Sequence, residues 1–255
     1  MAEGASERRI MILGGTTEAA QLARALERRP DLKVITSLAG RTREPTAVPG
    51  GTRSGGFGGI EGLIRFVREE HIDVVIDATH PYAEQISRHA VVASRSTGVP
   101  LVRLERPPWP RQPGDRWVLV DSVAEAARTA LDYGRRAFLT VGTKELQAFA
   151  GMERMWFLVR LIEQPIEPLP LLHYQVVTGR GPFTAEDERK LLQQHRIDMV
   201  IAKNSGGDAT YGKIAAARAL GLPVILVRRP IPPFDLPASA VFATADDVLA
   251  WLNKG

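Results

Sequence analysis

The sequence predicts an α/β protein of two successive domains, each a mainly parallel sheet flanked by helices. Short apolar runs rich in Val and Ile alternate with amphipathic segments along the whole chain. The alternation stops once, at the proline-rich stretch Arg106–Pro110, and then begins again. We therefore expect domains at residues 1–110 and 111–255, with a ligand cleft between them.

The composition is that of an ordinary globular protein with a core of normal size. The chain has 255 residues, 44% of them hydrophobic, and no run approaches the roughly 18 apolar residues of a membrane helix. Its polar N-terminus does not form a signal peptide, so we expect a cytoplasmic protein. The absence of cysteine excludes disulfides, thiolate metal sites and a cysteine nucleophile.

The net charge of +4 is carried mainly by arginine. Arginine forks pair well with carboxylates and phosphates, which favours an anionic ligand, although an arginine-rich codon usage would give the same excess. The basic residues are scattered and aromatic residues make up only 6%, so nucleic acid is not the expected partner.

In the first half, strands and helices alternate around one glycine-dense segment. The predicted strands are 8–13, 33–38, 72–77 and 100–104, and the predicted helices are 20–29, 60–70 and 83–96. Gly50–Gly59 predicts a loop that either approaches a ligand closely or moves.

The second half repeats the alternation. The predicted strands are 137–141, 155–162, 174–178, 197–203 and 223–227, and the predicted helices are 122–133, a short one ending at 149, 184–195, 209–220 and 244–252. Ser122, with Glu125 three residues later, predicts a capping box at the start of its first helix.

The first strand runs into a glycine turn and then a helix, the context in which such a loop cradles phosphate. The expected phosphate-binding residues are Gly14, Gly15, Thr16, Thr17 and Glu18. The full dinucleotide fingerprint is absent, because Thr16 stands at its second glycine and Ala19 at its third. Thr16 would crowd the phosphates unless the turn has a different shape, with the Thr16 and Thr17 hydroxyls donating directly to them. A plain tight turn is the alternative.

The end of the second strand lacks the acid that usually holds the ribose hydroxyls of NAD. It carries Ser37, Gly40 and Arg41, with Arg43 close behind. This set suits a 2′-phosphate, and hence NADP, in a Rossmann-like domain. A solvated basic turn would have the same appearance.

A polar cluster, Asp77–Tyr82, follows the buried strand at 72–77. Open α/β sheets bind ligands at such strand ends, so Thr79, His80 and Tyr82 are candidate cofactor contacts. His80 is a candidate proton donor, while a histidine bonded to backbone before Pro81 is the alternative. The five histidines show no metal-ligand spacing, and we expect no metal site.

A similar stretch recurs in the second half. IDVVIDATH at 72–80 is matched by IDMVIAKNS at 197–205, and both lead through a helix to a Gly-x-Pro strand start. Buried βαβ units also resemble one another by chance. If the repeat is real, Thr79-His80 and Asn204-Ser205 occupy equivalent strand ends.

The second strand end is the candidate substrate site, because a lysine leaving a buried strand must reach solvent or an anion. The residues concerned are Lys203, Asn204, Ser205, Gly206, Gly207 and Lys213. Gly207, Gly212 and Lys213 also fit most of the ATP-binding Walker pattern, but Ile214 replaces its magnesium-binding Ser/Thr. Anion binding by this loop remains possible without ATP hydrolysis.

Taken together, these motifs resemble the precorrin-6A reductase family of cobalamin biosynthesis. The resemblance covers nearly the whole chain and is carried by GGTTE at 14–18, DATHPY at 77–82, Arg106-Pro107-x-Trp109, and KNSGG at 203–207 with Lys213 and Arg229-Pro230. It implies an enzyme that uses NADPH to reduce one double bond of precorrin-6A, a tetrapyrrole bearing many carboxylates, to precorrin-6B. A branch of the family acts on the cobalt-containing substrate, and no residue here decides between the two.

The resemblance places NADPH in the first domain and the tetrapyrrole on the side of the second. We also expect a monomer in the cytoplasm that can contact other pathway enzymes transiently. Two other classes stay open: a non-catalytic nucleotide-binding module, and an ATP-using transferase acting through Gly207–Lys213.

Overall fold

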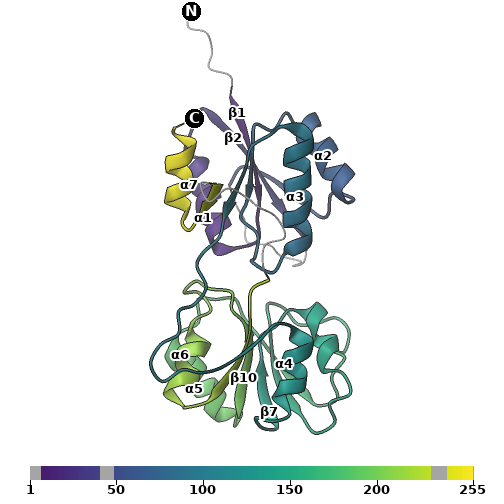
Figure 1. Cartoon of the computed structure of the whole chain (residues 1–255), viewed down its shortest axis with the longest axis vertical. Helices are drawn as coiled ribbons and strands as arrows, with labels where there is room; N and C mark the ends of the chain where they lie inside the picture. Colours follow the sequence, from purple (N-terminus) through teal and green to yellow (C-terminus); the bar gives the residue numbers. More distant parts are fainter. Residues whose placement is uncertain (1–6, 41–48, 231–239, 255) are drawn as a thin grey trace, which may run out of the picture. The chain divides into compact units, whose positions relative to one another are not determined.

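The computed structural model describes residues 7–40, 49–230 and 240–254. The chain divides into two compact units. Unit 1 takes in the described residues of 1–106 and of 231–255, and unit 2 spans Pro107–Pro230 (Figure 1). The change of unit after Arg106 falls at the predicted proline-rich connector.

Unit 1 is a six-stranded, entirely parallel sheet in the order β12-β5-β4-β1-β2-β3. Its strands are β1 (Arg8–Leu13), β2 (Leu32–Leu38), β3 (Gly51–Ser54), β4 (Val74–Asp77), β5 (Leu101–Leu104) and β12 (Val241–Phe242). Its helices are α1 (Thr17–Leu26), α2 (Ile60–Glu69), α3 (Glu84–Thr97) and α7 (Ala245–Leu252).

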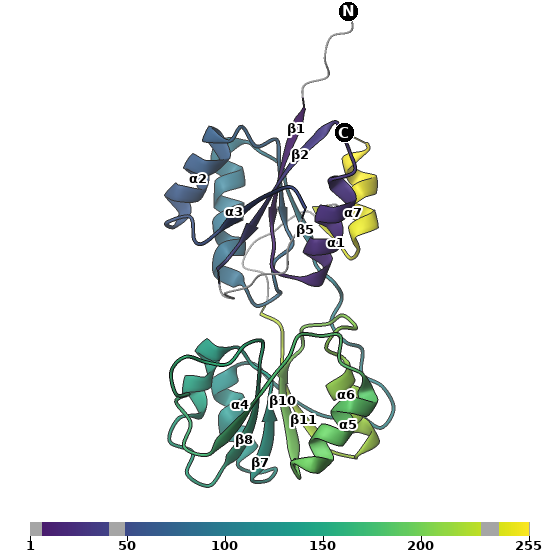
Figure 2. The ribbon, with the colours of Figure 1, turned by 180° about the vertical axis from the view of Figure 1, so that it is seen from behind.

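Helices cover both faces of this sheet, so its central strands are buried on both sides. Figure 2 shows α1 and α7 on one face and α2 and α3 on the other. Ile10, Ile12 and Val34 pack toward the first pair, while Met11 and Leu13 pack toward the second, as the two-residue period of a strand requires. The strands therefore read as continuous apolar runs that stop where the polar residues begin.

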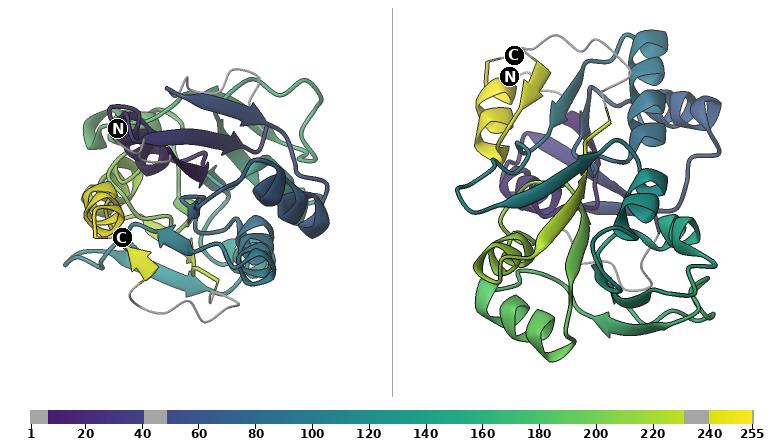
Figure 3. Two further views of the ribbon diagram at one scale, coloured as in Figure 1. Left: turned by 90° about the horizontal axis from the view of Figure 1, so that it is seen from above. Right: turned by 60° about the horizontal axis from the view of Figure 1, so that its bottom comes forward.

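The C-terminal segment belongs to unit 1, which corrects the expectation that residues 111–255 form one domain. β12 pairs with β5, and α7 buries Val248 and Leu252 in the core shared with α1. Arg8 at the start of β1 donates to the Leu252 carbonyl, so the start of β1 lies beside the end of α7. Figure 3 shows the short yellow strand β12 beside β5. The apolar face of α7 predicted a helix, but not the sheet that it covers.

Unit 2 is a second six-stranded parallel sheet, in the order β6-β11-β10-β7-β8-β9. Its strands are β6 (Arg116–Val120), β7 (Arg136–Leu139), β8 (Trp156–Leu161), β9 (Tyr174–Thr178), β10 (Met199–Lys203) and β11 (Pro223–Val227). Its helices are α4 (Val123–Ala130), the 3₁₀ helix η1 (Thr143–Phe149), α5 (Ala185–Gln194) and α6 (Gly212–Ala219).

The two sheets follow one plan. Reading each order across, β12, β5, β4, β1, β2 and β3 correspond to β6, β11, β10, β7, β8 and β9. The register agrees with the sequence repeat: Asp77 of β4 lies opposite Arg103 of β5, and Ala202 of β10 lies opposite Leu226 of β11. Asp77 and Ala202 are also equivalent in the two repeated stretches. The edge strand and its helix end the chain in unit 1 and begin unit 2, so unit 1 has the strand order of a circular permutation of unit 2.

The predicted fold class is confirmed, with three strands added. β3, β6 and β12 escaped prediction because they are short, edge-lying or glycine-rich, and such strands carry a weak local signal. Ser122 caps α4 as expected, but Glu125 accepts from the Asp121 amide instead of the Ser122 amide. Among the described residues, no helix is long and apolar enough to cross a membrane.

Candidate active site

The loop between β1 and α1 presents backbone donors at the carboxyl edge of the first sheet. Gly14 donates its amide to the Ser37 carbonyl at 2.9 Å, and Gly15 has a φ of +111°, which favours glycine. Thr16 is the N-cap of α1, so the first amides of that helix face the edge without helical partners. Their partial positive charge suits a phosphate.

The Thr16 hydroxyl has two partners in the structure. It accepts from the Ala19 amide at 3.1 Å and donates to the Ala78 carbonyl at 2.9 Å. Direct donation to a phosphate, as expected from the sequence, would require the second bond to break. The hydroxyl instead ties the glycine loop to the end of β4. Thr17 is exposed and better placed to reach a ligand.

Glu18 carries a negative charge in the first turn of α1, where it would repel a phosphate. Its carboxylate is paired with Arg106, at the end of β5, at 2.5 Å. This pair cancels the charge of Glu18 and holds a guanidinium beside the loop. Any contribution of Glu18 to phosphate binding therefore acts through Arg106.

At the end of β4, a buried network holds the turn that carries His80. Asp77 accepts from the Thr79 amide and hydroxyl, at 3.1 and 2.6 Å, and from Arg103 at 2.6 Å. His80 is half-buried beside Tyr82, with ring centroids 5.6 Å apart. The Tyr82 amide lies 3.4 Å from His80 Nδ1, so the backbone contact considered from the sequence is present but long.

An arginine that was not predicted from the sequence, Arg53, lies at the end of β2. Ser37 is buried and accepts from Arg53 of β3 at 3.1 Å, directly across the strand pair. Arg53 also donates to the carbonyls of Gly55 and Gly56, and its guanidinium lies 3.9 Å from the Phe57 ring and 5.2 Å from the Phe66 ring. Burial lowers the pKa of Arg53, and no acidic group among the described residues is paired with it.

Of the two other residues expected at this strand end, the structure describes Gly40 but not Arg41. Gly40 is exposed, with a φ of +67°. Arg41 lies outside the described residues, as does Arg43. Arg53 was not predicted as a site residue because β3 was not predicted. The sequence of a glycine-dense segment does not indicate that one of its residues pairs with Ser37 of β2.

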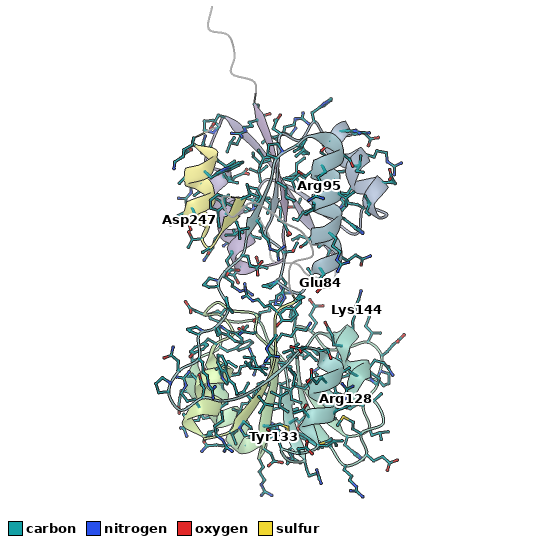
Figure 4. All side chains as sticks on the ribbon, in the orientation of Figure 1. Glu84, Arg95, Arg128, Tyr133, Lys144 and Asp247 are labelled. Carbon is teal, nitrogen blue, oxygen red and sulfur yellow. The ribbon has the colours of Figure 1, made fainter. Side chains whose placement is uncertain are left out.

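At the corresponding edge of unit 2, the two predicted lysines are bonded to other groups of the same unit. Lys203 forms an ion pair with Glu145 of η1, while Lys213 is buried, donates to the Thr210 carbonyl at 2.6 Å and lies 4.9 Å from the Trp109 ring. Lys144, labelled in Figure 4, is exposed on η1. Lys213 therefore braces its loop, and Lys203 is nearer to solvent.

Asn204–Gly207 form a turn fixed from three sides. Trp109 donates its backbone amide to the Asn204 side chain and its ring N–H to the Gly207 carbonyl, at 2.9 and 2.7 Å. Arg229 donates to the Asn204 and Ser205 carbonyls at 2.8 and 2.9 Å. Gly206 has a φ of +67°, and a β-carbon there would lie 2.1 Å from the Pro107 carbonyl oxygen. The structure brings all the predicted residues of this turn together.

Comparison with known proteins places the whole chain in one family. Residues 9–253 match the model of the precorrin-6x reductase CbiJ/CobK family. The chain belongs to this family. A precorrin-6A reductase of Rhodococcus erythropolis is 46% identical over 248 residues, covering 96% of this chain and 97% of the relative. The cobalt-precorrin-6A reductase of Salmonella typhimurium is 29% identical over 233 residues, covering 88% of each.

A solved CbiJ/CobK structure supports the fold as well as the sequence relation. The structure of a CobK precorrin-6A reductase superimposes with a TM-score of 0.90 at 43% identity, covering 97% of this chain and 96% of the other. The family predicted from GGTTE, DATHPY and KNSGG is thereby confirmed.

Proposed function

We propose that the protein is a reductase that uses NADPH to reduce one carbon–carbon double bond of precorrin-6A. Membership of the CbiJ/CobK family over residues 9–253 carries the proposal. NADPH, when bound, supplies a hydride to one carbon of the double bond, and a proton reaches the neighbouring carbon. The products are NADP⁺ and the dihydro macrocycle, precorrin-6B.

Unit 1 fits a dinucleotide at the carboxyl edge of its sheet. The left-handed Gly15 and the first amides of α1, which have no acceptor within the helix, suit a pyrophosphate, and Arg106 lies beside that turn. Ser37 and Arg53 form the part of the edge suited to the adenosine ribose. Strand ends of this kind are the usual place for such ligands in open α/β sheets.

Arg53 favours NADPH over NADH. Its described partners are a hydroxyl, two carbonyls and two aromatic rings, so its charge is not balanced by a carboxylate among the described residues. A 2′-phosphate would supply the balancing charge through charge-assisted hydrogen bonds. The adenosine ribose of NADH carries no such group.

His80 is the proposed proton donor, with solvent as the alternative. It is half-buried at the end of β4, next to the central strand β1, which leads into the glycine loop. Histidine titrates close to neutral pH and can both hold and give up a proton there. A positioned acid of this kind contributes typically about 10²–10⁴-fold to a rate.

Lys203 is the proposed contact for substrate carboxylates in unit 2, since it is the less buried of the two predicted lysines. Its pairing with Glu145 means that a substrate carboxylate would compete with an internal one. Lys213 contributes by holding the Asn204–Gly207 turn against Trp109.

The relatives favour the metal-free substrate. Those named precorrin-6A reductase are 42–48% identical to this chain, and those named cobalt-precorrin-6A reductase are 29% identical. The test is NADPH oxidation, followed at its nicotinamide absorbance, with precorrin-6A and with cobalt-precorrin-6A as separate substrates. Turnover with precorrin-6A is expected. Tight binding of ATP without binding of NADPH would instead favour the transferase.

A further inference from the structure

Four buried side chains at the end of β4 form a closed ring of hydrogen bonds. Arg103 Nη1 donates to Asp77 Oδ2 at 2.6 Å and to Ser87 Oγ at 2.9 Å. Thr79 Oγ1 donates to Asp77 Oδ1 at 2.6 Å and lies 3.4 Å from Ser87 Oγ. All four residues are at most 8% exposed. The ring therefore lies inside unit 1, directly beneath the turn that begins at Thr79.

The chemistry of the four side chains determines which group donates and which accepts in each hydrogen bond of the ring. An ionised carboxylate only accepts and a guanidinium only donates, so the Thr79 proton points to Asp77 and Ser87 receives from Arg103. The Ser87 proton is then left for Thr79. Arg103 also donates through Nε to Glu105, which adds a second carboxylate on its other side. The Thr79 amide, bonded to Asp77 at 3.1 Å, fixes the backbone at the same place.

The fold does not require these charges. At the same register positions unit 2 carries Ala202 and Leu226, both fully buried. Burying an ion pair costs solvation free energy, and a packed apolar pair is often as stable or more stable. Because the second sheet closes at this point without charges, stability of the sheet does not explain why unit 1 has them.

We infer that Asp77 and Arg103 are positioning residues, which hold the Thr79–Tyr82 turn so that His80 keeps one orientation at the edge of the sheet. The inference rests on the proposed function for its activity readout. Neither residue touches the reacting atoms; each acts through the Thr79 backbone and hydroxyl. Removing the ring would leave β4 paired and its turn free to change conformation.

The test replaces Asp77 and Arg103 with the apolar residue types that unit 2 has at the equivalent positions, alanine and leucine. The variant is Asp77→Ala/Arg103→Leu/Glu105→Gln, whose third change avoids leaving a carboxylate without its guanidinium. We expect a folded protein whose kcat falls at least about tenfold, while the KM for NADPH changes less than about threefold. The His80 ring signal in proton–carbon NMR, assigned with His80→Asn, is expected to shift and broaden.

A matched control removes an ion pair at the opposite edge of the same sheet. Arg9 pairs with Glu70 at the start of β1, and Arg9→Met/Glu70→Gln should leave both kcat and the His80 signal unchanged. A folded triple variant with kcat within twofold of the wild type and an unmoved His80 signal would overturn the inference.

If the triple variant does not fold, Asp77→Asn decides the question. Its side chain keeps the size of aspartate and loses the charge that draws Arg103. A shifted His80 signal in this folded variant supports the positioning role, and an unshifted one overturns it. The NMR readout needs neither cofactor nor substrate. An inactive wild-type protein would therefore count against the proposed function while leaving the positioning test intact.

Discussion

Units 1 and 2 share a strand order and a register, yet the carboxyl edges of their sheets differ in kind. In unit 1 the edge carries an ionic network at Asp77 and Arg103, together with an arginine, Arg53, that lacks an acidic partner among the described residues. In unit 2 the corresponding pair is apolar, and Arg160, at the position equivalent to Ser37, is paired with Glu188.

The difference shows which features belong to the fold and which belong to the site. Asp73 and Asp198, at equivalent places, each accept a backbone amide near the start of the neighbouring strand, so this contact is common to the two units. The residues that precede the repeated stretches, His71 and Arg196, both have a φ of 49°. What differs lies at the carboxyl edge, where ligands bind in such sheets.

The largest expected effect comes from His80, whose counterpart in unit 2 is Ser205. His80→Asn should lower kcat by about 100-fold or more if the imidazole supplies the proton. The measurement is NADPH oxidation with precorrin-6A across pH, with His89→Asn on α3 as the control. Full turnover by the variant at every pH would assign the proton to solvent.

The turn after β10 should be more sensitive to an added methyl group than other left-handed positions. Gly206→Ala should lower the free energy of unfolding by about 3 kcal/mol for two reasons. The new β-carbon would clash with the Pro107 carbonyl, and a left-handed φ is unfavourable for alanine. Gly221→Ala, at nearly the same φ but with nothing within 4 Å, should cost about 1–2 kcal/mol.

Urea unfolding followed by tryptophan fluorescence measures this difference, since three of the four tryptophans, at 109, 117 and 156, lie in unit 2. Equal costs for the two variants would mean that the loop moves away from Pro107 without strain.

Arg53 tests whether the unbalanced charge of unit 1 recognises a phosphate. Arg53→Leu should raise the Kd for NADPH about 10- to 100-fold, the loss of one or two charge-assisted hydrogen bonds, and leave the Kd for NADH nearly unchanged. Titration calorimetry with both dinucleotides measures this, and Arg65→Leu, exposed on α2, serves as the control. An equal rise in the Kd for NADPH and for NADH would show that Arg53 does not recognise the 2′-phosphate.

A smaller effect is expected at Thr36, a buried residue of β2 whose hydroxyl has no hydrogen-bond partner among the described residues. Its counterpart in β8 is Val159. Thr36→Val should stabilise the protein by about 1 kcal/mol, because an unsatisfied hydroxyl is replaced by a methyl group. A rise in Tm of about 2–4 °C is the corresponding shift for a chain of this size. A lower Tm would reveal an unseen partner for the hydroxyl.

The smallest effect concerns acid stability at the amino edge. Arg9 faces Glu70 in unit 1, whereas the equivalent Arg136 donates to the His195 carbonyl and stacks with Trp156 beside the imidazole. Burial, and then the charge of Arg136, lower the pKa of His195 below 6.5. The unfolded chain therefore binds more protons just below pH 6.5, and stability falls as the pH is lowered through that range.

His195→Gln should remove this component and flatten the pH dependence of the urea midpoint below pH 6.5. His173→Gln is the comparison, since His173 lies in the same unit at the start of β9. An unchanged pH dependence after His195→Gln would assign the acid sensitivity to another group.

Much of the fold was accessible from local sequence. Ile72–Asp77 and Ile197–Lys203 are apolar runs of strand length, and their alternation with amphipathic helices leaves few arrangements other than parallel sheets. The strands that local sequence missed, β3, β6 and β12, are edge strands of the two sheets. Their conformation is imposed by a neighbouring strand, which a local pattern does not contain.

The candidate site was accessible in part for the same reason. Gly14–Glu18, Asp77–Tyr82 and Asn204–Gly207 follow buried strands, so their position at the carboxyl edge could be read from order alone. Their partners could not be read in this way: Arg53, Arg103 and Arg106 reach Ser37, Asp77 and Glu18 across 16 to 88 residues of chain.

The sequence by itself determined the class of fold and the family, because each depends on motifs whose residues lie close together in the chain. It suggested the repeat of two βαβ halves, which the matching strand registers then confirmed. Only the tertiary structure decided that α7 belongs to unit 1, that Arg53 faces Ser37, and that Asp77 and Arg103 close a buried ring. These depend on strand neighbours and register, which are set by long-range pairing and by the packing of two sheet faces. The same pairing places His80 in a turn held by a buried ion pair and Ser205 in a turn without one at the equivalent positions, Ala202 and Leu226.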